Sequence, residues 1–302
     1  MRKIIFLILI SVLFKANCSV NAQNPIVTSI RTADPSAHVW ADGKMWLYTS
    51  HDVTNNYNDM DGYHAFSSSD LITWKDYGEI LHSRDLSWGV SGFMWAPTAA
   101  YRNGKYYLIY PHSPDGSREM KCGVAVSDFP QGPFKDLGWI EGVTPSKWLD
   151  PCVFEDVDGS YYLYWGVDVA YVAKLKENMT ELAEEPKVID YGAKNFFEAS
   201  YMHIKDGKYY FSYNAKNAGG DYSIGESPYG PFEYKGNLLI NVVQDHHSIV
   251  EFKNQWYLFY HWQNWKDGGK TQRNVAAEYL FYNADGTIKP ISPTDQGIQI
   301  RK

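Results

Sequence analysis

The chain has 302 residues, with 28 Lys and Arg against 35 Asp and Glu, and its formal net charge is -7. This acidic balance argues against nucleic acid or an anionic membrane surface as the partner. Hydrophobic residues make up 44% of the chain, which allows a sizeable core, and nothing in the composition indicates disorder. The aromatic content of 16% suits β-sheet packing, and it also suits contact with sugar rings.

The N-terminus has the pattern of an export signal. Two basic residues precede the apolar run IIFLILISVLF, and the tripeptide VNA at 20–22 is an acceptable cleavage site. We therefore expect residues 1–22 to be a signal peptide and the exported protein, periplasmic or extracellular, to begin near Gln23. The apolar run is too short to span a bilayer, so we do not expect a membrane-embedded protein. Lipid attachment at Cys18 is the alternative, although the residues before it form a poor lipobox.

Only Cys122 and Cys152 remain in the expected mature chain. They could form one disulfide in an oxidising compartment. Because a fold of this size does not need a disulfide, we predict two free, buried cysteines instead.

Five segments of the chain repeat one pattern: a polar dyad, a short apolar strand, a turn and an aromatic-rich strand. Their starts lie about 50 to 60 residues apart. They are ADPSAHVWADGKMWLY from Ala33, WAPTAAYRNGKYYLIY from Trp95, LDPCVFEDVDGSYYLY from Leu149, FEASYMHIKDGKYYFSY from Phe197 and HHSIVEFKNQWYLFY from His246. Asp-Gly and Asn-Gly turns between runs rich in Tyr, Trp, Val and Ile predict a β-hairpin in each repeat.

A repeat of this length with about four strands per unit predicts an all-β fold, a five-bladed β-propeller. Two packed β-sandwiches are the alternative, but they do not explain five matching hairpins. Helical periodicity is nearly absent, and only residues 174–185 could form a helical turn or two. No linker divides the mature chain, so we expect residues 23–302 to form a single domain.

In a propeller the first residues of the innermost strands converge at one mouth of the central channel. The repeats align Asp34, Ala96, Asp150, Glu198 and His246 at this level. Each carboxylate alone could close the channel by hydrogen-bonding backbone amides. Three of them at one repeat position instead predict a site in which like charges move the pKa values apart, as acid and base catalysis on a glycosidic bond requires.

These residues also carry a family resemblance. The ordered set ADPS, SSDLITW, WAPT, LDPCVFEDVDG, FFEASYMHIKDGKYY and HHSIV resembles glycoside hydrolase family 43, whose five-bladed propeller enzymes trim arabinose- and xylose-containing plant polysaccharides. The resemblance covers essentially the whole mature chain. It implies an inverting mechanism in which Asp34 is the general base, Glu198 the general acid, and Asp150 the third carboxylate, which raises the pKa of the acid and orients it. The base and acid are then expected about 6.5 to 9.5 Å apart.

The family also has a histidine at the start of the fifth blade, in a Gly-His-x-Ser pattern and often beside a central cation. Here the chain reads Asp245-His246-His247-Ser248, so His246 matches the family histidine while Asp245 replaces the glycine. The resemblance implies that His246 contacts substrate and a possible structural calcium, although the sequence leaves open which histidine faces the channel. No cofactor is expected to be required. Arg273 matches an arginine that reaches substrate hydroxyls in related enzymes; the alternative is an exposed, salt-bridged arginine.

Aromatic residues beside the carboxylates are expected to hold the sugar. Trp95 and Phe197 are the candidates for flanking the terminal sugar, and the polar loop 51–61 is long enough to shape the rim of the pocket. Trp40, Trp46 and Trp165 are expected to pack within the fold.

The leading hypothesis is a monomeric, exo-acting α-L-arabinofuranosidase or β-D-xylosidase with a plant polysaccharide or oligosaccharide as its substrate. An endo-acting arabinanase or xylanase and a noncatalytic carbohydrate-binding propeller are the alternatives. An invertase-type fructosidase fits less well, because Ala33-Asp34-Pro35 lacks the Asn that precedes its nucleophile. A sialidase also fits poorly, since SSSDLITW is one residue short of an Asp-box and occurs once.

Overall fold

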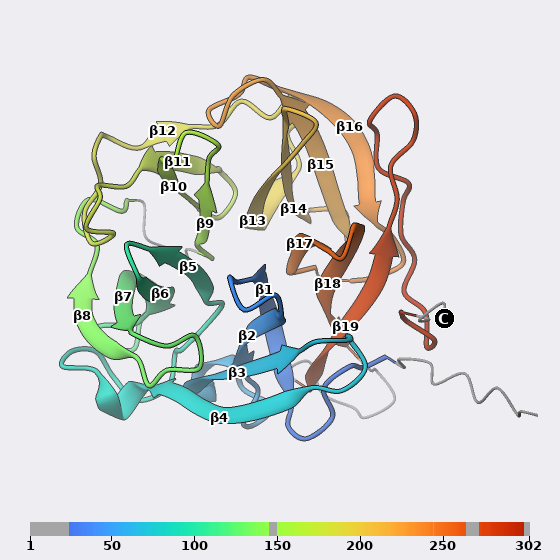
Figure 1. Ribbon diagram of the computed structural model, residues 1–302. Helices are drawn as coiled ribbons and strands as arrows, with labels where there is room; N and C mark the ends of the chain where they lie inside the picture. Colours follow the sequence, from blue (N-terminus) through green and yellow to red (C-terminus); the bar gives the residue numbers. More distant parts are fainter. Residues whose placement is uncertain (1–23, 145–149, 244, 264–271, 299–302) are drawn as a thin grey trace, which may run out of the picture.

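The computed structural model describes residues 24–144, 150–243, 245–263 and 272–298. The predicted signal peptide and Cys18 therefore lie outside the described residues. Five antiparallel sheets follow one another round a central axis in chain order, which confirms the five-bladed β-propeller (Figure 1). Apart from two short 3-10 turns, η1 Tyr57–Asp59 and η2 Ser83–Asp85, the regular elements described are strands. Among the described residues no helix is long and apolar enough to cross a membrane.

Four blades have four strands each, and the described part of the fifth has three. Blade 1 contains β1 Thr32–Val39, β2 Met45–His51, β3 Gly62–Ser68 and β4 Lys75–His82, and blade 2 contains β5 Thr98–Arg102, β6 Lys105–His112, β7 Lys121–Ser127 and β8 Lys135–Trp139. Blade 3 contains β9 Cys152–Glu155, β10 Tyr161–Trp165, β11 Tyr171–Lys174 and β12 Lys187–Val188. Blade 4 contains β13 Phe196–Lys205, β14 Lys208–Ala215, β15 Gly220–Gly225 and β16 Phe232–Leu239, and blade 5 contains β17 His247–Phe252, β18 Gln255–Gln263 and β19 Arg273–Leu280.

The inner hairpin of each blade is the pairing that the repeats predict. In three blades the two central turn residues both have positive φ, at 103–104, 206–207 and 253–254. This is the turn geometry whose twist matches that of the flanking strands, and it favours Asn-Gly and Asp-Gly. Residues 174–185, expected to form a helical turn, instead form turns and isolated bridges that lead to β12, so that expectation was wrong.

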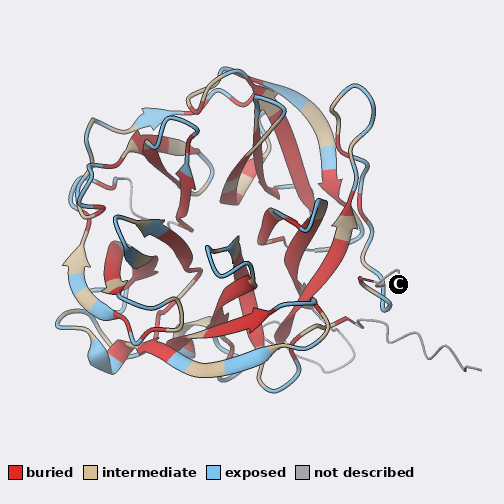
Figure 2. Ribbon diagram, in the orientation of Figure 1, coloured by how far each residue is buried: buried red, intermediate tan, exposed pale blue. Residues whose placement is uncertain are grey.

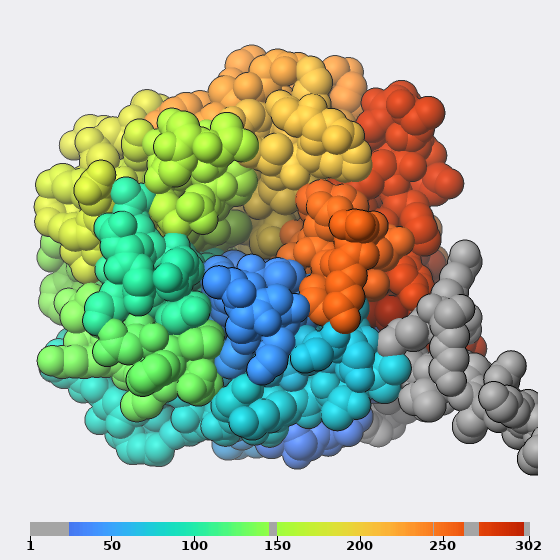
Figure 3. All heavy atoms as spheres, viewed as in Figure 1, coloured from blue at the N-terminus to red at the C-terminus, as the bar shows by residue number. Residues whose placement is uncertain are grey.

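The hydrophobic core is divided among the interfaces between neighbouring blades. Five clusters of buried side chains each join residues of two adjacent blades. Inner and middle strands are accordingly buried, while the outermost strands alternate with exposed residues (Figure 2). The space-filling view shows the blades packed against one another round the ring (Figure 3). Trp46 and Trp165 are fully buried in these clusters, as expected, and Trp40 packs at their edge.

Small polar side chains link the inner strands of neighbouring blades. The hydroxyl of Ser36 accepts a hydrogen bond from the amide of Ala99, and Thr98 accepts one from Val153 in the same way. The backbone amide of Met202 hydrogen-bonds to the Cys152 side chain. Both cysteines are free and buried, as predicted, so Cys152 occupies a position where other blades use a hydroxyl.

The ring closes between the last blade and the first. The amide of Ala37 in β1 donates to Ser248 in β17, completing this set of contacts between blades 5 and 1. The segment before β1 also runs beside β19, where the amide of Ile26 donates to the carbonyl of Val275 at 2.9 Å. Blade 5 is therefore held to blade 1 by a side-chain hydrogen bond and to the segment before β1 by a backbone hydrogen bond.

Replacing Thr98 with Val is expected to destabilise the protein by about 1 to 3 kcal/mol, because it leaves the buried amide of Val153 without its acceptor. Ser200 is the matched control: it occupies the corresponding position in blade 4, is equally buried, and its hydroxyl has no hydrogen-bond partner in the part of the chain that the structure describes. Ser200→Ala is expected to change stability little. Urea denaturation of the two variants measures the difference, and equal losses would contradict the role assigned to Thr98.

Candidate active site

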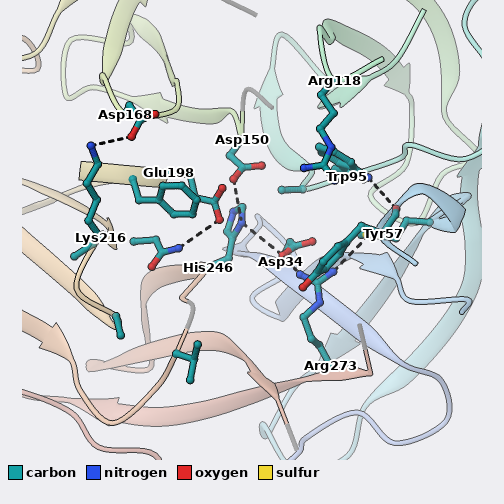
Figure 4. A pocket seen from close by; sticks show the side chains of 17 residues that line it. Asp34, Tyr57, Trp95, Arg118, Asp150, Asp168, Glu198, Lys216, His246 and Arg273 are labelled. Carbon is teal, nitrogen blue, oxygen red and sulfur yellow. Dashed lines mark hydrogen bonds and ion pairs between the residues drawn. The ribbon is translucent and has the colours of Figure 1, made fainter. Parts of the chain in front are cut away.

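A pocket with a volume of about 830 Å³ lies where the inner strands begin. Every site residue predicted from the sequence lines it: Asp34, Trp95, Asp150, Phe197, Glu198, His246 and Arg273. Figure 4 shows Asp34 and Glu198 on opposite sides of His246, with Asp150 beside it. The alignment of the repeats thus placed the three carboxylates correctly at one mouth of the channel.

Irregular backbone turns these carboxylates toward the pocket. The register of β1 against β2 shifts between Ala33 and Ser36, and Asp34 inside this bulge has a φ of 52°. Asp150 has a φ of 43°. In β13 the register shifts on both sides of Glu198, and here the next residue, Ala199, takes the positive φ. A bulge re-aims a side chain at a strand end, and non-glycine residues in this region of φ are uncommon, which marks the position as one under functional constraint.

Asp34 is a buried carboxylate surrounded by donors. One of its oxygens lies 3.0 Å from Nη1 of Arg273 and 3.0 Å from Nδ1 of His261, and the other accepts the hydroxyl of Ser50. Burial alone would raise the pKa of Asp34, but the charge of Arg273 and the hydrogen bond from His261 outweigh it and hold the pKa well below the usual range. Asp34 is therefore ionised at neutral pH.

Arg273 joins two buried carboxylates. Its Nε and its backbone amide donate to Oδ2 of Asp52 at 3.0 and 2.9 Å, and its Nη2 donates to Oδ1 at 2.8 Å. Its Nη1 donates to Asp34, and its guanidinium carbon lies over the ring of Tyr57, 5.2 Å from the ring centre. Burial lowers the pKa of Arg273, but the two aspartates more than reverse this effect. The alternative of an exposed arginine was wrong, since only 3% of its surface is exposed.

Asp150 is buried like Asp34, but its pKa moves in the opposite direction. Burial raises the pKa well above the usual range, the charges of Glu198 and Asp34 raise it further, and Arg273 and the amide of Ala199 offset only part of this. Two carboxylates in one pocket thus differ in their affinity for a proton. This separation is the arrangement by which paired carboxylates divide acid and base roles.

Glu198 is buried, with 7% of its surface exposed, and is the third residue of β13. Its Oε1 accepts a hydrogen bond of 3.3 Å from Nδ2 of Asn214, directly opposite it on β14. Phe197 and Asn214 also line the pocket. The carboxyl is thus held by its own sheet.

His246 is the histidine that faces the pocket. Its Nδ1 lies 3.6 Å from Asp34 and 4.0 Å from Asp150. Burial lowers its pKa to about 4 despite the charge of Asp34, so the ring is neutral at pH 7. His247 instead points into the fold, between Asp245 and the hydroxyl of Ser212.

The surroundings of His246 do not form a calcium-binding set. Calcium takes 6–8 oxygen ligands, whereas His246 offers a nitrogen and the nearest oxygen of Asp34 is already bound by Arg273 and His261. Within the described residues no group of three or more His, Cys, Asp or Glu side chains could hold a metal ion.

Trp95 and Tyr57 form one wall of the pocket. The indole Nε1 of Trp95 donates to the carbonyl of Tyr57 at 2.9 Å, which ties the 51–61 loop to blade 2. Gly92 permits this contact, because a Cβ at its φ of 78° would lie 1.9 Å from the carbonyl oxygen of Asn58. The prediction that this loop shapes the pocket is confirmed by Tyr57 and Met60, which line it.

Sequence reasoning missed four residues that contact the predicted carboxylates or Arg273: Ser50, Asp52, His261 and Asn214. Each lies near the end of the second strand of an inner hairpin or just after that strand. The first strand of the same hairpin carries a predicted site residue or directly follows one. A search of the residues that pair with the predicted carboxylates across each hairpin would have found Asn214, which lies opposite Glu198, but not Ser50, which pairs with Ala33.

Comparison with known proteins decides the family. Residues 22–288 match the model for the glycosyl hydrolases family 43. The chain belongs to this family. It is a glycosidase, as the resemblance in its motifs implied.

Individual relatives agree with this assignment. The chain is 36% identical to a xylosidase/arabinosidase of Bacteroides ovatus, covering 87% of this chain and 96% of that protein. It is 38% identical to xylosidase/arabinosidase 43A of Humicola insolens, with coverage of 89% and 99%. The crystal structure of a family 43 enzyme from Xanthomonas citri complexed with xylotriose superposes with a TM-score of 0.83 at 36% identity, covering 91% of this chain and 94% of that one.

Substitution of the two aspartates is expected to change stability in opposite directions at neutral pH. Asp150 has a raised pKa in the folded state, so it costs the wild type stability as pH rises above about 4. Asp150→Asn removes this cost and is expected to raise stability at pH 7 by roughly 1 to 2 kcal/mol. The gain should shrink as pH falls toward about 4 and should be absent at lower pH.

Asp34 has a depressed pKa, so it stabilises the fold above about pH 4 and loses this effect as pH falls. Asp34→Asn breaks a buried ion pair and is expected to cost about 3 to 5 kcal/mol at pH 7. Thermal unfolding of both variants between pH 3 and 8 provides the measurement. Shifts of the same sign at pH 7 would contradict the charge assignment.

Proposed function

We propose that this glycosidase is exo-acting and inverting, and that it releases terminal α-L-arabinofuranose or β-D-xylose from plant hemicellulose or pectin side chains. The observation that carries the proposal is the pair of opposite pKa shifts in one pocket: Asp34 is kept ionised, while Asp150 gains affinity for protons beside Glu198. The names of the relatives, xylosidase and arabinosidase, support both sugars. In such a pocket one or two hydrogen bonds, a difference in binding free energy of about 1 to 3 kcal/mol, decide between arabinose and xylose.

In the proposed mechanism Asp34 accepts a proton from the water that attacks the anomeric carbon. Its contacts with Arg273 and His261 fix the position of the carboxylate. Glu198, which is held in position by the side chain of Asn214, donates a proton to the departing oxygen. Asp150 and Glu198 lie in one pocket, where two like charges are disfavoured, so the pair retains a proton for the departing oxygen. The neutral His246, Trp95 and Phe197 surround the sugar ring.

Export to the periplasm or extracellular space and a monomeric state remain predictions of this proposal. An N-terminal sequence beginning near Gln23 in the secreted protein, together with a mass in solution near one chain, would support them.

The first experiment is hydrolysis of 4-nitrophenyl α-L-arabinofuranoside and 4-nitrophenyl β-D-xyloside by residues 23–302. Activity on either substrate is expected, and Glu198→Ala should lower kcat about 100- to 10,000-fold. Glu226→Gln is the control, because this carboxylate lies on the surface of the same blade and pairs with Lys208.

The stereochemistry is followed by proton NMR of the first sugar released, whose anomeric configuration should be opposite to that of the substrate. A retained configuration would rule out the inverting roles of Asp34 and Glu198. Failure on both substrates with rapid fragmentation of arabinan or xylan would favour the endo-acting alternative. Binding of these polymers without hydrolysis would favour the noncatalytic propeller.

The proposed chemistry requires no cofactor, and the possible structural calcium is tested separately. A ligand that binds only the folded state raises the unfolding temperature in proportion to the logarithm of its concentration. Because the donors around His246 do not suit calcium, we expect 10 mM calcium or EDTA to leave both the unfolding temperature and kcat unchanged. If calcium raises the unfolding temperature of the wild type but not that of His246→Gln, His246 contacts calcium.

A further inference from the structure

The pocket extends beyond the three carboxylates to a charged pair that the mechanism does not use. Nζ of Lys216 lies 2.8 Å from Oδ1 of Asp168, and both residues line the pocket. Figure 4 shows this pair on the Glu198 side of the pocket, away from Asp34 and Arg273. In the proposed mechanism the leaving group occupies the side of the pocket where Glu198, the general acid, lies.

Two turns from different blades present this pair. Asp168 lies in the turn between β10 and β11 of blade 3, and Lys216 lies in the turn between β14 and β15 of blade 4. The amide of Asp168 donates to the carbonyl of Phe197 at 2.8 Å, and the amide of Lys216 donates to the carbonyl of Asn195 at 2.8 Å. Both turns are therefore anchored to the strand that carries the general acid, within three residues of it.

The turns themselves are tightly constrained. Gly166 has a φ of 128°, and a Cβ there would lie 2.1 Å from the carbonyl oxygen of Val169. Gly219 has a φ of 81°, and a Cβ there would lie 2.3 Å from the carbonyl oxygen of Leu239. The backbone positions of Asp168 and Lys216 relative to Glu198 are thus fixed by packing.

The pair has little value for stability. The side chains of Lys216 and Asp168 are 44% and 61% exposed, and ion pairs this exposed typically contribute less than about 1 kcal/mol. Their exposed atoms face the pocket and solvent. An ammonium group has three N–H donors and a carboxylate has several acceptor sites, so the pair can still bond to a ligand while remaining intact.

A donor and an acceptor side by side complement two neighbouring sugar hydroxyls, one accepting from the ammonium and one donating to the carboxylate. Phe197, next to Glu198 in the chain, also lines the pocket, and an aromatic face beside polar groups is suited to a sugar ring. We propose that Asp168 and Lys216 bind the vicinal hydroxyls of the sugar next to the scissile bond on the leaving-group side. They would thereby favour oligosaccharide substrates over simple glycosides.

The inference rests on the proposed function, and its test compares two substrates with the same terminal sugar. The leaving sugar of xylobiose carries vicinal hydroxyls, whereas the leaving group of 4-nitrophenyl β-D-xyloside, 4-nitrophenol, has none. If the wild type prefers arabinose, α-1,5-arabinobiose and 4-nitrophenyl α-L-arabinofuranoside replace them. The quantity measured is kcat/KM on the disaccharide divided by kcat/KM on the nitrophenyl glycoside.

Asp168→Ala and Lys216→Ala are each expected to lower this ratio about tenfold, chiefly through KM for the disaccharide. The double variant should fall no further than the worse single variant, because the two side chains act as a unit. The exchange Asp168→Lys with Lys216→Asp should recover part of the ratio. Lys208→Ala is the matched control: Lys208 begins β14 at the opposite end from Lys216, forms a similarly exposed ion pair with Glu226, and does not line the pocket.

A ratio within twofold of the wild type in both single variants would overturn the inference, as would an equal fall in Lys208→Ala. These outcomes are distinct from failure of the proposed function, in which the wild type itself hydrolyses neither nitrophenyl glycoside.

Discussion

The ion pair between Arg273 and Asp34 is the interaction on which the site depends. Asp34 lies in the first strand of the ring and Arg273 begins the last described strand, so their contact exists only when blade 5 closes against blade 1. Asp52, just after β2, binds the same guanidinium from the other side. Closure of the propeller and assembly of the charged site are therefore one event. A closed ring without this arginine would leave two buried carboxylates without their cation, at a cost of several kcal/mol.

The same arginine explains why two similar carboxylates behave differently. Asp34 and Asp150 are both buried, and burial raises the pKa of each. Arg273 contacts Asp34 directly, whereas Asp150 faces the negative charges of Glu198 and Asp34. The position of one cation thus decides which carboxylate stays ionised. The local sequences around the two residues, Ala-Asp-Pro and Leu-Asp-Pro, do not indicate that the pKa values of Asp34 and Asp150 move in opposite directions.

The blades and the convergence of the predicted carboxylates could be predicted because they follow from local patterns. Each hairpin depends on its own turn and on alternating apolar residues, and the repeat then places equivalent positions at one mouth. The links between blades had a sequence signal as well, since Ser36, Thr98, Cys152, Ser200 and Ser248 all stand two positions after the residues that the repeats align at the mouth of the channel. Ser200 departs from the pattern, and there the hydroxyl of Tyr201 bonds across to Ile249 instead.

The contacts of Ser50, Asp52 and His261 could not be predicted in the same way. They depend on which residues of separate strands meet across the axis, and on bulges that rotate Asp34 by adopting a positive φ without glycine. The expected helical turn at 174–185 failed for a related reason: its Leu175 and Leu182 pair as a bridge rather than along one helix face. His246 and His247 are adjacent in sequence, and only the bonds of His247 to Asp245 and Ser212 determine that His246 faces the pocket.

A buried ion pair is weak evidence for stability, because removing two charges from water costs about as much as their attraction returns. An apolar pair of similar volume would pack the junction of blades 1 and 5 at least as well. The retention of Arg273 between two aspartates is better explained by the charge that it maintains on Asp34. The buried charges here thus serve the ionisation state of the pocket, while the fold itself is held by the apolar clusters between blades.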